Sequence, residues 1–121
     1  MHVAGQTNYI SHWLLTHHLL PLLTTANSVT CRIVNVTSDG HAAFPPKSAI
    51  EFFDINLEKK SAMMRYGQSK LANVLHAKEL HRRYGPKNDD GVSQTHIIVA
   101  AVHPGHIDTY VWQLTWHWYS L

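Results

Sequence analysis

Thr95 to His103 contains the unbroken apolar run Ile97-Ile98-Val99-Ala100-Ala101-Val102. A short apolar run without polar alternation is typical of a strand that is covered on both faces, and such strands belong to parallel sheets. Arg32 to Val36, with the sequence Arg-Ile-Val-Asn-Val, is a second β-branched run and predicts another central strand. We therefore expect these two strands to lie in one parallel sheet.

Helical patterns lie on both sides of the first strand. Thr7 to Leu23 is dense in apolar residues at helical spacing, and Pro21 is expected to kink or end this helix. Met63 to Tyr84 is the strongest helical pattern, and Gly85-Pro86 should terminate it. Ser38 to Ala62 predicts a long loop with at most a turn of helix, and loops of this length are often functional. The order helix, strand, helix, strand predicts an α/β fold, namely the second half of a doubly wound parallel sheet, incomplete in its strands.

The composition narrows the classes of protein. The chain has 121 residues, of which 45% are hydrophobic and 15% charged, so one packed domain is expected rather than a disordered chain. The net charge of +2, without a basic cluster, predicts no nucleic-acid partner. Cys31 is the single cysteine and no secretory signal pattern is visible, so we expect an intracellular protein, in the cytoplasm. Trp13 to Leu23 is too short for a membrane span, and the eleven histidines lack the spacing of a metal site.

Tyr66-Gly67-Gln68-Ser69-Lys70 places a phenol and an amine four residues apart, on one face of the second predicted helix. A tyrosine ordinarily has a pKa of about 10, and a nearby ammonium favours the phenolate and lowers that pKa. Tyr66 could then act as a general acid/base. Taken alone, the spacing also fits an ordinary pair on a helix surface.

Four blocks in a fixed order resemble the short-chain dehydrogenases/reductases, and within them the retinol-dehydrogenase-like group with its fungal members. The blocks run from Thr7 to Thr16, from Arg32 to Ser38, from Tyr66 to Asn73, and from His103 to Gly105 with Ile107 and Thr109. The resemblance covers nearly everything from Gln6 to Thr109. It implies a Rossmann-type domain that binds NAD or NADP and transfers hydride reversibly between nicotinamide and a small alcohol or carbonyl substrate.

The resemblance also implies catalytic roles for four residues. Tyr66 matches the acid/base that exchanges a proton with the alcohol oxygen, and Lys70 matches the partner that lowers the tyrosine pKa and binds the nicotinamide ribose. Ser38 matches the serine that hydrogen-bonds the substrate oxygen, although a plain serine at a strand end is the alternative. Asn8 matches the asparagine that holds a water in the proton relay, with an ordinary cap or helix-kink residue as the alternative. These groups would meet at the carboxyl ends of the strands.

The segment after the last strand matches the part of the family that runs beside the nicotinamide. Pro104 and Gly105 form its turn, and the positions of Ile107 and Thr109 contact the carboxamide in the family. The alternative is an ordinary turn between a strand and a loop. We expect Tyr66 and Lys70 to contact the cofactor as well.

Two features depart from the family pattern. The glycine-rich turn that binds the dinucleotide phosphates does not occur in the sequence, so neither NAD nor NADP is favoured. The resemblance implies that residues 1–109 are a partial NAD(P)-binding domain with the catalytic half, and it stops before residues 110–121, which we expect to be an atypical aromatic tail. The sequence therefore predicts a family member truncated at both ends.

Two readings follow for the function. The first is an oxidoreductase of the short-chain type, with activity impaired by the truncation. The second is a non-catalytic fragment that acts at most as an interaction or dimerisation module, through an exposed sheet edge and the tail. The helices from Thr7 to Leu23 and from Met63 to Tyr84 match those that often form the dimer interface in the family, so a homodimer is the expected assembly.

Overall fold

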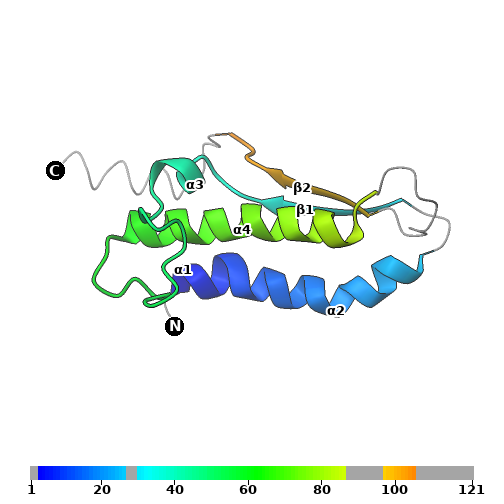
Figure 1. The fold of residues 1–121 in the computed structure, drawn as a ribbon, viewed down its shortest axis with the longest axis horizontal. Coiled ribbons are helices and arrows are strands. Elements are labelled where there is room, and N and C mark those ends of the chain that lie inside the picture. The colour runs from blue at the N-terminus through cyan, green and yellow to red at the C-terminus, as the bar shows by residue number, and fades with distance from the viewer. Residues whose placement is uncertain (1–2, 27–29, 87–96, 106–121) are drawn as a thin grey trace, which may run out of the picture.

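The computed structural model describes residues 3–26, 30–86 and 97–105. In chain order, the elements are α1 (Val3–Gly5), the π-helical turn η1 (Gln6–Ile10), α2 (Ser11–Thr25), β1 (Cys31–Val36), α3 (Gly40–Ala43), α4 (Ala62–Tyr84) and β2 (Ile97–Val102). Figure 1 shows α4 between the two strands and the rod of α1, η1 and α2. The α4 helix contacts both strands, α1, η1 and α3. The predicted order of helices and strands is confirmed.

Pro21 does not end the first helix, which corrects one of the two outcomes expected for it. The α2 helix continues through Pro21 to Thr25, although the ring leaves this residue without an N–H for the helical ladder. The hydroxyls of Thr24 and Thr25 each donate to the Pro21 carbonyl oxygen at 3.0 Å, which gives this carbonyl side-chain partners in the last turn. Figure 1 shows the axis of α2 changing direction toward its C-terminal end. Among the described helices, none is long and apolar enough to cross a membrane.

The α4 helix begins and ends at clear sequence signals. Ser61 is its N-cap, and its hydroxyl accepts a hydrogen bond from the Met64 N–H at 3.2 Å. At the other end the Gly85 N–H donates to the His81 carbonyl at 2.8 Å, and Pro86 follows. The helix therefore spans nearly the range predicted for it, from one residue earlier.

The two strands pair in parallel, as predicted, with Cys31 opposite Ile97 and Val36 opposite Val102. Ile33 and Ile97 face α4 and form the core with Leu80. The prediction that the β2 strand is covered on both faces is wrong for the described residues. A single helical layer covers one face of the pair, so that Val36, on the opposite face, is 54% exposed.

Candidate active site

The candidate site lies where the strands end. Because β1 and β2 are parallel, Thr37-Ser38 and His103-Pro104-Gly105 emerge at the same edge of the sheet. The Thr37 N–H donates to the Val102 carbonyl at 2.8 Å and extends the pairing beyond β1. The N-terminal half of α4 runs along this edge and carries Tyr66 and Lys70.

Tyr66 is half-buried, and its ring packs against the start of α3. A Cβ atom on Gly40 would lie 2.9 Å from the Tyr66 Cε1 atom, so the ring occupies the space that any larger residue would need. The next residue, Gly67, lies equally close to α3, since a Cβ there would be 2.6 Å from the carbonyl carbon of Phe44. Two glycines thus allow α3 to approach α4 beside the tyrosine.

Lys70 lies one helical turn after Tyr66, and its Nζ atom is 5.7 Å from the centroid of the Tyr66 ring. The ammonium donates to the Val36 carbonyl oxygen at 3.2 Å, at the very end of β1. Burial lowers the pKa of Lys70 below its ordinary value of 10.5, because desolvation disfavours the charged form. The structure brings together the two residues that the spacing paired.

Ser38 lies two residues after the end of β1, and its hydroxyl forms hydrogen bonds within its own loop. The Oγ atom donates to the Asp39 carboxylate at 2.9 Å and accepts from the Gly40 N–H at 3.2 Å. The Ser38 carbonyl accepts from the His41 Nδ1 atom at 2.5 Å. Ser38 therefore stands at the predicted strand end, and these hydrogen bonds hold the first turn of α3 in place.

Asn8 reaches α4 from the π-helical turn η1, a type of distortion that is frequent at functional sites. Its amide nitrogen donates to the Ser69 hydroxyl at 3.1 Å, and that hydroxyl donates to the Tyr66 carbonyl at 2.7 Å. Asn8 is thus linked through Ser69 to the backbone of the turn between Tyr66 and Lys70. Asn8 therefore lies in an irregular helical turn and contacts α4 close to Tyr66, while its role in a proton relay stays a prediction.

The predicted cofactor segment is described only in its first part. Pro104 and Gly105 are exposed just after β2, and Gly105 has a φ of 87°, a left-handed conformation that suits glycine. Ile107 and Thr109 lie outside the described residues, as does the tail 110–121.

The sequence interpretation missed three residues of this region: Thr37, Gly40 and Asn73. The Thr37 hydroxyl donates to the Lys70 carbonyl at 2.9 Å, and the Asn73 amide donates to the Val36 carbonyl at 3.3 Å. The sequence position of Asn73 could have indicated its place in this region, because Asn73 follows Lys70 by three residues and so lies on nearly the same face of the helix. Gly40 offered a weaker signal, as a glycine directly after an aspartate.

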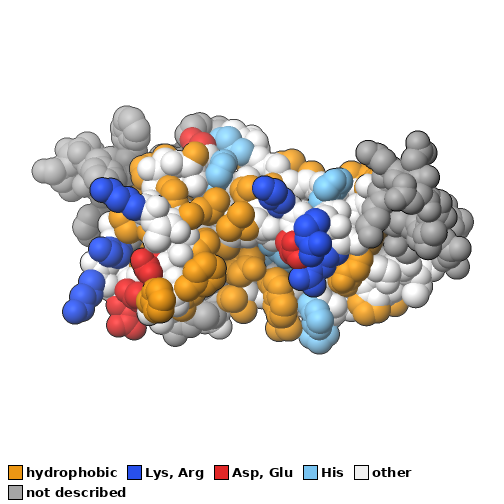
Figure 2. All heavy atoms as spheres, viewed as in Figure 1, with side chains coloured by type: hydrophobic (Ala, Val, Ile, Leu, Met, Phe, Trp, Pro, Cys, Tyr) orange, Lys and Arg blue, Asp and Glu red, His pale blue; other side chains and the backbone are white. Residues whose placement is uncertain are grey.

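A separate cavity of about 360 Å³ lies between η1, α2 and α4, closed in part by the loop around Phe52. Its described lining is mostly apolar and includes none of Tyr66, Lys70 and Ser38. Figure 2 shows apolar side chains gathered across this face of the molecule. The exposed apolar residues that line the cavity are Ile10, Trp13, Phe52, Ile55 and Leu75.

Two half-buried polar rings lie at the inner side of this cavity. Tyr9 and His76 meet edge to face, with ring centroids 5.9 Å apart. Burial raises the pKa of Tyr9 and lowers the pKa of His76, so both groups are favoured in their neutral forms. His76 also lies 3.4 Å from the Asn35 amide nitrogen, through its Nδ1 atom.

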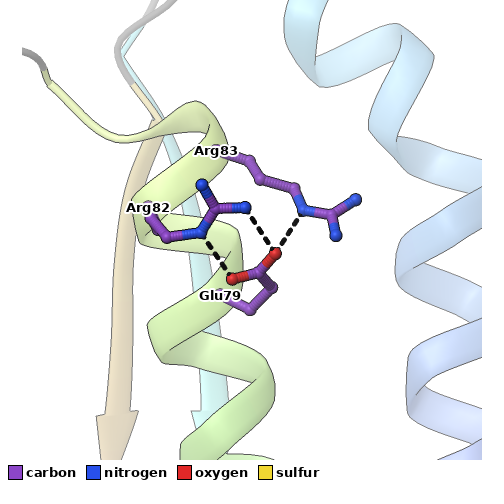
Figure 3. Close-up of polar contacts among 3 residues, drawn as sticks. All are labelled: Glu79, Arg82 and Arg83. Atoms are coloured by element: carbon purple, nitrogen blue, oxygen red, sulfur yellow. Dashed lines mark hydrogen bonds and ion pairs between the residues drawn. The ribbon is translucent and has the colours of Figure 1, made fainter.

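The C-terminal half of α4 carries an exposed charge cluster beside the cavity. Figure 3 shows the side chains of Arg82 and Arg83 both pointing at the carboxylate of Glu79. Arg82 Nε lies 2.7 Å from Glu79 Oε2, and Arg83 Nε lies 2.6 Å from Glu79 Oε1. The hydrogen bonds from Arg82 and Arg83 lower the pKa of Glu79 to about 2. The cluster lies on the solvent-exposed surface of the helix, away from Tyr66.

Tyr66 and Lys70 lie one turn apart beside the carboxyl ends of the parallel strands, which is where doubly wound α/β proteins bind their ligands. Sequence comparison then gives the family. The chain is 54% identical over 112 residues to the short-chain dehydrogenase/reductase drtF of Aspergillus calidoustus, an alignment with 86% of this chain and 34% of that protein. By this homology the chain belongs to the short-chain dehydrogenase/reductase family.

Other relatives agree with this family. The chain is 37% identical over 108 residues to retinol dehydrogenase 11 of Mus musculus, covering 88% of this chain and 29% of the relative. It is 38% identical over 107 residues to the chloroplastic short-chain dehydrogenase TIC 32 A of Brassica napus, and the alignment covers 85% of this chain and 31% of the relative. The chain thus spans about a third of the length of these curated relatives. No family model and no solved structure matches it.

Proposed function

We propose that this chain carries the catalytic side of an oxidoreductase site, at which hydride passes reversibly between NAD or NADP and a small alcohol or carbonyl substrate. The pairing of Tyr66 with Lys70 at the sheet edge is the observation that carries the proposal. The proposal extends the function named for the relatives to a chain that spans about a third of their length. Retinol is not proposed as the substrate, because a shared fold does not specify a ligand.

The groups at the sheet edge suit the nicotinamide end of such a cofactor. Lys70 offers an ammonium to ribose hydroxyls, and Pro104 and Gly105 offer exposed backbone at the same edge. Among the described residues, a Cβ on Gly105 would meet nothing within 4 Å. Ile107 and Thr109 would continue this contact. When bound, the cofactor supplies the group that accepts or donates the hydride.

The protein's own residues handle the proton. In alcohol oxidation Tyr66, as phenolate, accepts the hydroxyl proton, and in carbonyl reduction the phenol returns it. Lys70 stabilises the phenolate through its nearby positive charge. Ser38 holds the substrate oxygen, for which its hydroxyl would exchange the Asp39 carboxylate for the substrate. Asn8, which supports the Tyr66–Lys70 turn through Ser69, holds a water of the proton relay.

Binding of NADH and NADPH, followed by fluorescence, tests this proposal. Lys70→Ala should weaken binding about tenfold or more, since a hydrogen bond from a charged group contributes about 1.5–3 kcal/mol. Lys78→Ala is the matched control, because Lys78 is an exposed lysine on the same helix. Tyr66→Phe should abolish turnover of alcohols, because it removes the hydroxyl that exchanges the proton. Absence of binding by a folded, monodisperse sample would refute the proposal.

A second candidate function rests on the open face of the sheet. Val34, Val36, Ile98 and Val102 are 53%, 54%, 44% and 39% exposed on one side of the strand pair, and apolar patches of this kind mark interaction sites. In this reading the chain is an interaction module without catalysis. A folded chain that binds neither cofactor but forms a complex that Val36→Lys disrupts would favour it over the enzyme.

We also propose a homodimer through the face with the apolar cavity, because η1, α2 and α4 line it and these helices match the dimer helices of the family. Light scattering after gel filtration tests this. Trp13→Glu should produce a monomer, and His12→Glu, another change to glutamate on exposed α2 outside the cavity, should not. A monomeric parent chain would refute the proposal.

A further inference from the structure

Polar side chains fill the contact between β1 and α4 at the end of the sheet. Thr37 is 6% exposed and Asn73 is 4% exposed, and half-buried Asn35 lies beside them. A buried polar group destabilises a fold unless its hydrogen bonds are restored inside the protein. Apolar residues would fill the same space without needing hydrogen bonds. The presence of polar residues at this contact therefore calls for a reason.

Each of the three side chains joins the strand to the helix. The Thr37 hydroxyl donates to the Lys70 carbonyl at 2.9 Å, and the Asn73 amide donates to the Val36 carbonyl at 3.3 Å. The Asn35 amide donates to the carbonyl of Asn73 at 3.2 Å. All three hydrogen bonds cross between β1, with its extension at Thr37, and one turn of α4.

These hydrogen bonds restrict motion that apolar packing allows. A strand rises about 3.3 Å per residue, so a slip of α4 by one residue along β1 would break all three bonds. Apolar contacts, which have no preferred direction, would resist the same slip much less. The polar contacts therefore fix the axial position of α4 against β1.

The fixed position matters because Lys70 uses the same acceptor. Its Nζ atom and the Asn73 amide both donate to the Val36 carbonyl, at 3.2 and 3.3 Å. The Thr37 hydroxyl donates to the Lys70 backbone carbonyl, and the Thr37 N–H donates to the Val102 carbonyl of β2. The lysine is thus held at both its backbone and its side chain.

We propose that Thr37 and Asn73 are positioning residues that hold α4 in register with β1 and thereby place the Lys70 ammonium at the sheet edge. Neither residue would touch substrate or cofactor. The proposal rests on the role given to Lys70 above, but it concerns the free protein and can be tested without any ligand.

The test is competitive acylation of lysines in the 121-residue chain over the alkaline range, with each site measured by mass spectrometry. The pH dependence gives the pKa of Lys70, and exposed Lys78 serves as the internal reference. Thr37→Val keeps the side-chain shape and removes the hydroxyl, so the pKa of Lys70 should rise toward 10.5 as the ammonium gains solvent. Thr37→Ser keeps the hydroxyl and should leave that pKa near the parent value.

Gln68→Met is the matched control for a merely structural effect. Gln68 is 6% exposed on α4 and bonds the Glu51 N–H and the Ile55 carbonyl, so it ties the helix to the loop rather than to β1. This variant should lose stability without a change in the pKa of Lys70. An equal rise in Gln68→Met, or no rise in a folded Thr37→Val, would overturn the proposal.

Asn73→Ala provides the second variant if Thr37→Val does not fold, and the same rise is expected. Failure of both variants to fold, while Gln68→Met folds, would assign the pair to general stability and would also overturn the positioning role. Because no cofactor enters the experiment, an absence of NADH binding would count against the proposed function and leave this result unchanged.

Discussion

Replacement of Gly67 by alanine tests the close approach of α3 to α4. A Cβ at this position would lie 2.6 Å from the Phe44 carbonyl carbon, 2.8 Å from the Phe44 oxygen and 2.9 Å from the Gly40 oxygen. All three are backbone atoms, so no side-chain rotation relieves the overlap. To reach an ordinary contact of 3.4 Å, α3 must move by at least 0.8 Å, the difference between 3.4 and 2.6.

Two opposing terms set the size of the effect. Overpacking in a well-packed region costs about 1–3 kcal/mol. Alanine in place of glycine inside a helix stabilises the folded state by about 1 kcal/mol. We therefore expect Gly67→Ala to lower the free energy of unfolding by about 1 kcal/mol, with a range from about 0 to 2 kcal/mol.

Urea unfolding followed by circular dichroism measures this change. Gly5→Ala is the matched control, because Gly5 is also helical and a Cβ there would meet nothing within 4 Å. The control should gain stability, by up to about 1 kcal/mol. If both variants gained equally, the contact between α3 and α4 drawn here would be refuted.

Further predictions concern the core, the cavity and the surface. Ile97→Ala should lower the free energy of unfolding by about 2–5 kcal/mol in urea, because Ile97 is fully buried, whereas Val36→Ala on the open face should cost much less; equal losses would contradict the assigned faces. The pKa of His76 is below 6.5 in the folded chain, so the unfolded chain binds its proton first and stability should fall as pH drops from 6.5 through the folded pKa. His76→Gln should flatten that decline, and an unchanged pH profile would count against burial of this ring. Glu79→Gln should change the thermal midpoint little, because Arg82 and Glu79 are 68% and 43% exposed, and a large drop would show that the cluster supports the fold.

The helices and strands were predicted from the sequence more accurately than the packing around them. The apolar run from Ile97 to Val102 is a strand in parallel with β1, because β-branched residues at short range specify an extended chain. The prediction that β2 is buried on both faces is wrong for the described residues, since burial depends on what packs against the sheet and not on the strand's own residues. Likewise α2 persists through Pro21, which the local preference of proline did not indicate.

For the candidate site, too, local features were predictable from the sequence and contacts between distant segments were not. The spacing from Tyr66 to Lys70 is a local property of a helix and could be read directly. The local bonding of the Ser38 hydroxyl, and the bond from Asn8 to Ser69, depend on loop and helix geometry that no spacing contains. Contacts over long sequence separations, such as Thr37 with Lys70, were beyond the pattern altogether.

The two residues of the proposed acid/base pair, Tyr66 and Lys70, are held in place by different contacts. Tyr66 is placed by α3, which reaches it across Gly40, whereas Lys70 is placed by hydrogen bonds to Val36 and Thr37. Both supports come from the chain that leaves β1, over residues 36–44. A change in α3 should therefore affect the tyrosine first and a change at Thr37 the lysine first. The segment after β1 thus contacts both residues, at the Tyr66 ring through Gly40 and at the Lys70 carbonyl through Thr37.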